Sequence, residues 1–372
     1  MKKNILPSVV CMVIYIFSAV ACNNNSEKIE EEIKEEVQQE VQQEIHEETF
    51  KRGEVALKAI TIGDKTFEKT TEVYVTGSNG ITITGAAPRF KEEKLNEKEK
   101  GVFVEGRIVK ISPFAMSKYE VTQELYEAVM TGNTENLNIN NFNSLLPPEG
   151  EEQKYRPAEM ITWFDSVYFC NRLSEKTGLE KVYTISIAEE DGIVNGRIKK
   201  ADVVMDITKN GYRLPTAAEW ELAARGGNPD DEAWWYEYSG QPLGDDILYN
   251  ATENPYLDSV AWTQNNSGRK THEVGKKKPN TLGIYDMCGN VYEWCWDWKF
   301  DNDNITSSDS LYKIDGIITN PQGLTSGDSK TGRGGGFCNS TGANSFYVLH
   351  YANSPANNGG KNIGFRLVRT VK

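Results

Sequence analysis

The stretch NTLGIYDMCGNVYEWCWDW, Asn280 to Trp298, carries the strongest local signal in this chain of 372 residues. Aromatic residues occupy every second position near its end, at Tyr292, Trp294, Trp296 and Trp298. Because successive side chains of a β-strand point to opposite faces, this alternation predicts a half-buried strand with the four rings on one face. Most of these rings are expected to be core residues.

A helix is predicted upstream, in the stretch RLPTAAEWE. Pro215 suits the first turn of a helix, and Thr216 with Glu219 three residues later matches the capping-box pattern. Trp220 would then point toward the core.

The remaining segments mix helices and strands without a regular repeat. Phe114 to Met130 combines a strand with a helix that Thr122 can cap, and Arg156 to Gly178 places apolar residues at helical spacing. The C-terminal part is rich in glycine, asparagine and aromatic residues and shows little periodicity. Together these patterns predict an α+β, loop-rich fold.

Residues 1–21 have the layout of a secretory signal peptide, with two lysines, an apolar run and small residues before Cys22. The apolar run is too short for a membrane-spanning helix. Because Ser-Ala-Val-Ala-Cys resembles a bacterial lipobox, we predict that Cys22 is lipidated and holds the protein at the bacterial outer membrane or cell surface. The alternative is an ordinary cleaved signal peptide followed by an incidental cysteine.

Residues 22–53 are predicted to form the lipidated N-terminus and an acidic helical spacer. Apolar residues recur at every fourth position from Ile29 to Ile45. Four residues turn an α-helix by about 400°, so this stripe drifts by about 40° per step and forms no heptad seam. We therefore expect a solvated stalk, with weak self-association as the alternative. Residues 54–100 are predicted to form a small β region and a charged connector, and residues 101–372 the main domain.

Charge and cysteine content restrict the function. The net charge of −13 argues against a nucleic-acid partner, whose phosphates such a surface would repel. An exported protein can form disulfides, and the domain holds four cysteines, Cys170, Cys288, Cys295 and Cys338. Four cysteines allow three pairings, among which the sequence does not choose.

Several sequence blocks resemble the formylglycine-generating enzyme, or sulfatase-modifying factor, family. They occur in the family's order and cover about residues 101–370. The resemblance implies a variant C-type-lectin-like fold, whose function depends on the site. The blocks are Tyr119–Gln123, Gly211–Glu221, Asn280–Trp294, Arg333–Gly335 and Gly364–Arg366.

The resemblance does not extend to the metal ligands of the catalytic members. The oxidases bind copper through two cysteines just after Arg-Gly-Gly, whereas here Cys338 stands near the first position and no cysteine follows it. The related iron enzymes use clustered histidines, and the chain outside the signal peptide has only His46, His272 and His350. Copper and iron are therefore not expected, and a formylglycine-generating oxidase is kept as the alternative function.

Calcium is implied by the resemblance alone. In relatives, the block that contains Asn290 and Glu293 lies beside a structural calcium ion, which side-chain and backbone oxygens can bind. No dense acidic loop accompanies these residues here. The alternative is that Glu293 belongs to a buried hydrogen-bonded pair.

The composition after Arg333-Gly-Gly points to binding. Between Gly336 and Ile363 only Lys361 is charged, and most other residues are small, amidic or aromatic. Aromatic residues supply rigid contact area, and Ser, Asn and Gly supply adaptable hydrogen bonds. This pattern resembles the variable proteins of diversity-generating retroelements, in which mutagenesis rewrites asparagine codons and leaves the scaffold unchanged.

The sequence thus predicts a surface-anchored lipoprotein that binds an unknown protein or small molecule through its C-terminal residues. The alternative is a loop-rich tail that only folds. Strand alternation in residues 346–351 predicts that Phe346 and Tyr347 point in opposite directions, one into the core and one toward a ligand. The predicted ligand-binding residues are Phe337, Cys338, Ser340, Thr341, Asn344, Phe346, Tyr347, His350, Tyr351 and Asn353.

Overall fold

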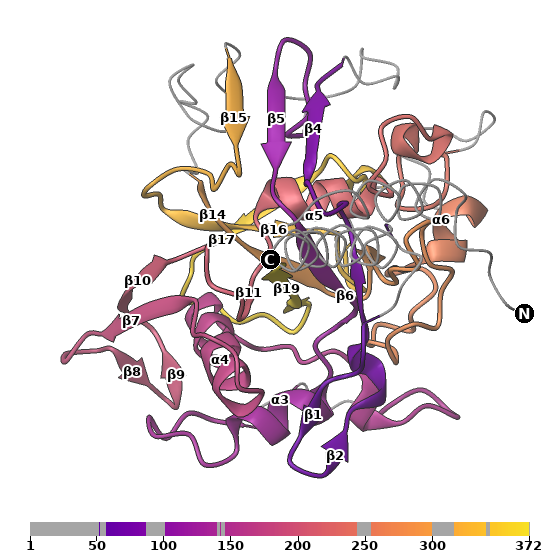
Figure 1. Ribbon diagram of the computed structural model, residues 1–372. Helices are drawn as coiled ribbons and strands as arrows, with labels where there is room; N and C mark the ends of the chain where they lie inside the picture. Colours follow the sequence, from indigo (N-terminus) through magenta and orange to yellow (C-terminus); the bar gives the residue numbers. More distant parts are fainter. Residues whose placement is uncertain are drawn as a thin grey trace, which may run out of the picture. The chain divides into compact units, whose positions relative to one another are not determined.

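The central sheet of the domain joins strands from both ends of the sequence (Figure 1). All its neighbouring strands are antiparallel, in the order β11-β19-β6-β3. Across this sheet Arg369 Nε donates to Glu72 Oε2 at 2.8 Å. The strands are β3 (Glu72–Tyr74), β6 (Phe114–Glu120), β11 (Tyr212–Arg213) and β19 (Arg366–Thr370).

This computed structural model describes residues 52, 57–86, 101–139, 142, 146–243, 254–299, 316–339 and 343–371. The predicted signal peptide, Cys22 and the helical spacer up to residue 51 lie outside the described residues. In the described part of the chain, no helix combines the length and apolar character needed to cross a membrane.

A second sheet carries the C-terminal residues, in the order β17-β16-β14-β18. Strand β14 pairs antiparallel with β16 and parallel with β18, and β16 pairs antiparallel with β17. The strand predicted from the alternating aromatic residues is confirmed as β14. The strands are β14 (Tyr292–Lys299), β16 (Ser329–Arg333), β17 (Tyr351–Ser354) and β18 (Ile363–Gly364).

The two faces of β14 are buried to different extents. On the aromatic face Trp294 is fully buried, while the other three rings are half-buried and pack against the core around α4. The opposite face, with Glu293, Cys295, Asp297 and Lys299, is buried along its whole length. The polar face of the strand is therefore the more deeply buried one.

Residues 57–86 do not form a separate β region. Strand β3 joins the central sheet, and β4 pairs with β5 in a third sheet of order β15-β5-β4. The domain therefore extends N-terminally of Gly101, the boundary expected from the sequence. The reason is that β-branched runs this short need partner strands, and β5 and β6 provide them. The third sheet consists of β4 (Ile81–Thr84), β5 (Ile108–Ile111) and β15 (Ile317–Thr319).

The predicted helix starts are confirmed at α3 and α5, and the helical spacing within residues 156–178 is confirmed as α4. Thr122 Oγ1 accepts a hydrogen bond from Leu125 N, and Thr216 with Glu219 forms the predicted capping box. Trp220, on α5, is fully buried as expected. The helices are α3 (Gln123–Met130), α4 (Trp163–Lys176), α5 (Ala217–Ala224) and α6 (Pro255–Val260).

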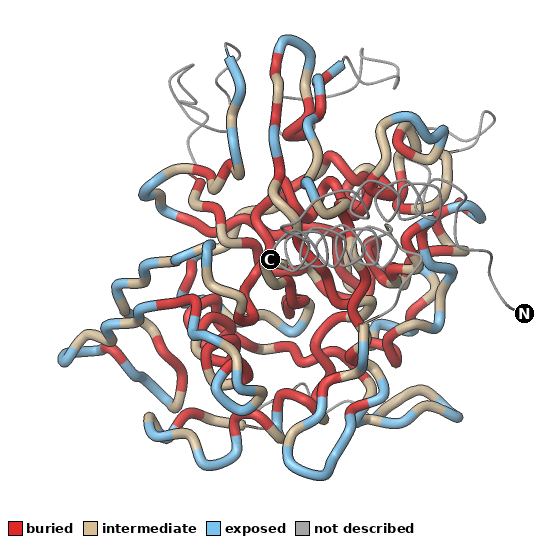
Figure 2. Tube along the Cα trace, in the orientation of Figure 1, coloured by how far each residue is buried: buried red, intermediate tan, exposed pale blue. Residues whose placement is uncertain are grey.

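Short elements complete the domain. They pair with one another as short strands, and the buried residues concentrate along the central strands and α5 (Figure 2). These elements are β1 (Thr61–Ile62), β2 (Lys65–Thr66), β7 (Tyr183–Ile187), β8 (Ile193–Val194), β9 (Arg197–Ile198), β10 (Ala201–Met205), β12 (Ala261–Trp262) and β13 (Cys288–Gly289).

The buried face of β14 generates a pH-dependence prediction. Burial raises the pKa of Asp297 from 3.8 to about 7, while the hydrogen bond from Ala217 N and the charge of Lys330 partly offset this. The folded state therefore holds this proton more tightly than the unfolded state, so Asp297 stabilises the fold in acid, and this stability is lost as the pH rises through about 7.

Asp297→Asn should raise the melting temperature more at pH 8 than at pH 5, because the amide stays neutral. Asp202→Asn, an exposed change on β10, is the control and should have no such pH dependence. Equal effects of Asp297→Asn at both pH values would contradict this assignment.

Candidate functional site

The candidate site is built on Arg333, the last residue of β16, which is fully buried. Its Nη2 donates to Glu221 Oε2 on α5 at 2.7 Å. Its Nη1 donates to the carbonyl oxygens of Leu349 and His350 at 3.0 and 2.9 Å. One guanidinium therefore ties α5 to both ends of the loop that leads from β16 to β17. We call the described residues 334–339 and 343–354 the tail segment.

The tail segment starts with glycines that turn the chain. Gly334 and Gly335 have φ angles of +88° and +78°, which L-residues rarely adopt. A Cβ atom on Gly335 would lie 2.5 Å from a carbon of the Phe346 ring. The Arg-Gly-Gly sequence thus allows the chain to leave β16 and pass directly against the buried Phe346.

Asn290 holds the next residues of the tail in place. Its backbone oxygen accepts from Phe337 N at 2.8 Å, and its own N–H donates to Trp262 O at 3.0 Å. Its side-chain oxygen accepts from His272 N at 3.0 Å, and its amide nitrogen donates to Glu120 Oε2 at 2.7 Å. Asn290 therefore connects the tail segment to the loop of residues 262–272.

The predicted aromatic contacts are buried. Phe337, Phe346 and Tyr347 are between 1% and 3% exposed. Phe346 and Tyr347 belong to a cluster with α6, and the rings of Tyr347 and Tyr238 lie 5.4 Å apart. These side chains therefore pack in the core, beneath the surface of the tail segment.

The expected alternation of Phe346 and Tyr347 is wrong. Residues Ala343–Phe346 form a 3-10 helix, a turn follows, and β17 begins only at Tyr351. Because this segment is not extended up to Tyr351, all residues from 345 to 349 are buried together.

The remaining predicted residues fall into three groups. Tyr351 is 9% exposed, and Lys299 Nζ lies 3.7 Å from the centre of its ring. Ser340 and Thr341 lie outside the described residues. Four residues are half-buried, so that part of each is in contact with solvent: Cys338, Asn344, His350 and Asn353.

Cys338 lies among polar side chains. The Asn339 amide, next in sequence, donates to the Tyr292 hydroxyl. Burial raises the pKa of the Cys338 thiol, and the charge of Lys361 offsets this only in part. The thiolate form, which a soft metal needs, is thus disfavoured.

The other described cysteines do not complete a copper site. Cys170, Cys288 and Cys295 are buried free thiols. Cys288 Sγ donates to Phe346 O at 3.1 Å and accepts from Ser239 N at 3.3 Å. Cys338 is the one half-buried thiol among the described cysteines, so the residues present do not fit a two-thiolate copper site.

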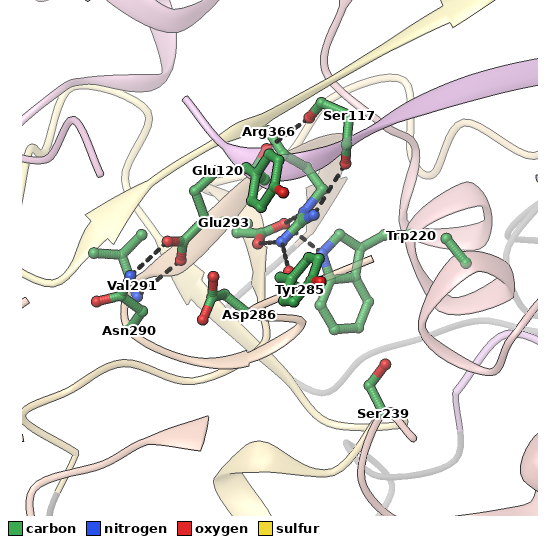
Figure 3. A network of polar contacts seen from close by, with 12 residues as sticks. Ser117, Glu120, Trp220, Ser239, Tyr285, Asp286, Asn290, Val291, Glu293 and Arg366 are labelled. Carbon is green, nitrogen blue, oxygen red and sulfur yellow. Dashed lines mark hydrogen bonds and ion pairs between the residues drawn. The ribbon is translucent and has the colours of Figure 1, made fainter. Parts of the chain in front are cut away.

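A buried ion pair occupies the position at which calcium was implied (Figure 3). Arg366 Nη2 and Nε donate to Glu293 Oε1 and Oε2, at 2.5 and 2.6 Å. Trp220 Nε1 also donates to Glu293 Oε2, at 2.7 Å. Glu293 is therefore a member of a buried hydrogen-bonded pair, as in the alternative kept from the sequence.

Asn290 and Glu293 do not fit a calcium site. The Asn290 oxygen accepts a backbone N–H, and both Glu293 oxygens face N–H donors, whereas calcium needs free oxygen ligands. Within the described residues, no group of three or more His, Cys, Asp or Glu side chains is placed to hold a metal.

Two further carboxyl groups lie next to this ion pair (Figure 3). Burial raises the pKa of Glu120 well above its ordinary value, and the charges of Asp286 and Glu293 add to this effect. Burial also raises the pKa of Asp286, to about 6. Glu120 accepts from Val291 N and Asn290 Nδ2, so it fixes the turn that carries Asn290. This network of buried polar groups thus positions Asn290, which holds the start of the tail segment.

The sequence analysis missed the loop that contacts the tail segment. Ser267 Oγ donates to Phe337 O at 3.2 Å, and the rings of Trp262 and His272 stack at 3.6 Å. This loop has no hydrophobic periodicity and matches none of the family blocks. The sequence feature that could have identified this loop is its content of Trp, His and basic residues.

The buried aromatic residues lead to a stability prediction. Phe346→Ala and Tyr347→Ala should each lower the stability of the fold by about 3 to 5 kcal/mol, because each leaves a cavity in the core. Thermal or denaturant unfolding measures the loss. Tyr256→Ala is the matched control, since that ring is 40% exposed, and it should cost much less. If either tail variant melted like the wild type, its ring would not be part of the core.

The chain is similar to several known proteins. The chaperone protein LppX of Paenibacillus barcinonensis is 36% identical over 224 residues, which cover 59% of this chain and 71% of that protein. The formylglycine-generating enzyme of Thermomonospora curvata is 29% identical over 170 residues, 44% of this chain and 52% of that enzyme. The chain thus spans about half the length of that enzyme.

Among solved structures, Treponema denticola variable protein 1 superposes with a TM-score of 0.61 and 32% identity, over 84% of this chain and 99% of that one. Residues 65–371 match the sulfatase-modifying factor enzyme 1-like domain. The fold is the variant C-type-lectin-like α+β fold of these relatives. The chain therefore belongs to the family of the sulfatase-modifying factor enzyme 1-like domain.

Proposed function

We propose that the protein is a non-enzymatic ligand-binding lipoprotein that presents the tail segment as its binding surface. The observation that carries the proposal is the construction of this segment. Arg333, the two glycines and Asn290 fix its path, while half-buried Cys338, Asn344, His350 and Asn353 face solvent in part. A rigid backbone with small polar side chains on its surface suits binding, because little entropy is lost when a ligand is bound.

The comparisons support a protein ligand. A variable protein and a protein named as a chaperone are both similar to this chain. An amide side chain such as that of Asn344 carries both donors and an acceptor, which suits the backbone of a polypeptide. A diversified surface on a constant scaffold would explain why the tail differs in composition from the rest of the chain.

Photo-crosslinking tests this function even though the ligand is unidentified. A photo-reactive amino acid at position 344 or 353, introduced into the full chain, should yield discrete covalent adducts with a protein from cells of the native host. The same amino acid at Thr184, an exposed residue of β7, is the control and should yield none. Adducts at Thr184 alone, or at no position, would contradict the proposal.

Anchoring is proposed from the N-terminal sequence. Cys22→Ser should move the protein from the membrane fraction to the soluble fraction, because a lipid chain on that cysteine would be its attachment to the membrane. Cys338→Ser is the control and should leave the protein in the membrane fraction. Unchanged fractionation of Cys22→Ser would exclude the anchor.

Formylglycine generation is the second candidate function. The family and the position of Cys338 after Arg333-Gly-Gly favour it. The raised pKa of Cys338 and the lack of a second half-buried thiol among the described cysteines speak against it. Purified protein supplied with copper and a cysteine-containing sulfatase peptide should therefore form no aldehyde. Aldehyde formation that Cys338→Ser abolishes would replace the binding proposal.

A further inference from the structure

A basic loop lies beside the tail segment of this acidic protein. Residues 269–278 contain a single acidic side chain, Glu273, although the chain as a whole carries a net charge of −13. In Figure 1 this basic loop belongs to the orange segment that follows α6. Its basic residues are Arg269, Lys270, Lys276, Lys277 and Lys278.

Most of this positive charge is not neutralised by the protein. Lys276 pairs with Glu273 at 2.9 Å, and Lys277 lies near Asp258. Arg269, Lys270 and Lys278 make no ion pair with any residue that the structure describes, and Arg269 and Lys278 are exposed.

Hydrogen bonds tie the basic loop to the tail segment. Ser267 Oγ donates to Phe337 O and accepts from Arg269 N, at 3.2 and 3.1 Å. Lys270 N donates to Ser267 O at 3.2 Å. The backbone of Arg269 and of Lys270 is thus held close to the serine that contacts Phe337, at the start of the tail segment.

A stack of rings stiffens the base of this loop. The imidazole of His272 lies on Trp262 with 7° between the ring planes, and Lys277 Nζ lies 4.0 Å from the indole centre. Because the imidazole covers one face of the indole, Lys277 lies over the other. The His272 nitrogens face two oxygens, of Glu151 and of Ser267. The loop is therefore a fixed part of the surface.

The segment that follows the tail segment adds one positive charge. Between Gly336 and Ile363 the one charged residue is Lys361, which acts electrostatically on Cys338. Cations therefore lie on the loop that is bonded to Phe337 and on the segment that follows the tail segment, and the tail segment itself contains no Asp or Glu.

We infer that the tail segment and the basic loop together bind an acidic peptide segment of a partner protein. This inference rests on the proposed binding function and adds the class of ligand. Carboxylates of the partner would pair with Arg269, Lys270 and Lys361, while its backbone meets the amides of the tail. The net negative charge of the protein opposes the approach of acidic molecules, so a local group of cations is needed to attract one.

An anionic membrane fits these observations less well. Membrane insertion needs exposed apolar side chains, and none of the large apolar residues exposed in the described part of the chain belongs to the basic loop or the tail segment. The amides of the tail suit directional hydrogen bonds to a polypeptide.

Peptide binding to the full-length protein tests the inference. Fluorescence anisotropy should show binding of a labelled peptide of four Glu-Gly-Tyr repeats, with about tenfold or greater loss for the Gln-Gly-Tyr counterpart and at high salt. Arg269→Glu with Lys270→Glu should abolish this binding. Lys176→Glu with Lys200→Glu, at exposed positions of α4 and the β9–β10 turn, is the control with the same change in charge. All variants should melt like the wild type.

The outcomes separate this inference from the proposed function. Equal binding of the two peptides, no binding of either, or equal losses in the two charge variants would overturn the acidic-ligand inference. Crosslinking at positions 344 and 353 would still support the binding function in each of these cases, and its absence would remove that function independently. If vesicles containing phosphatidylglycerol bound through Arg269 and Lys270 and the peptide did not, a membrane would replace the peptide as ligand.

Discussion

The buried guanidinium of Arg333 is the contact on which the candidate surface depends. It joins Glu221 of α5 to the two carbonyl oxygens that precede β17, so the loop between β16 and β17 is fixed at both ends. Glu221 also accepts from Val102 N and Arg225 Nε, which satisfies its carboxylate fully. A buried ion pair needs such additional hydrogen bonds, because desolvation of the two charges is costly.

The same arrangement recurs elsewhere in this loop-rich domain. Arg366 binds Glu293 with two donors, and Arg213 binds Glu219 in the same way. Each pair links segments that a regular sheet or helix would not join. The strands and the helix that carry these residues thereby gain defined relative positions, because planar guanidinium–carboxylate pairs restrict both distance and orientation. The fold can therefore keep a fixed backbone under a surface whose own side chains contribute little to stability.

The site divides into an inner and an outer layer with different chemistry. Aromatic side chains of the tail segment fill the core next to α6, and the glycines of Arg-Gly-Gly give them room. Amide and small side chains remain on the outside, next to the basic loop. Substitutions on the outside can therefore change the ligand without changing the fold. This separation favours a binding protein, whereas a copper oxidase needs two thiolates held together.

The sequence by itself determined features that depend on neighbouring residues. The capping box of Thr216 and Glu219 and the alternation of β14 follow from contacts within a few residues, and the ordered family blocks indicated the fold. Only the tertiary structure decided that the polar face of β14 is the buried one, that Phe346 and Tyr347 both point inward, and that the 262–278 loop lies against Phe337. These features arise from contacts between residues about 50 to 120 positions apart, such as Ser267 with Phe337 and Glu221 with Arg333. No local pattern encodes such contacts, because burial depends on which segments meet in the folded chain.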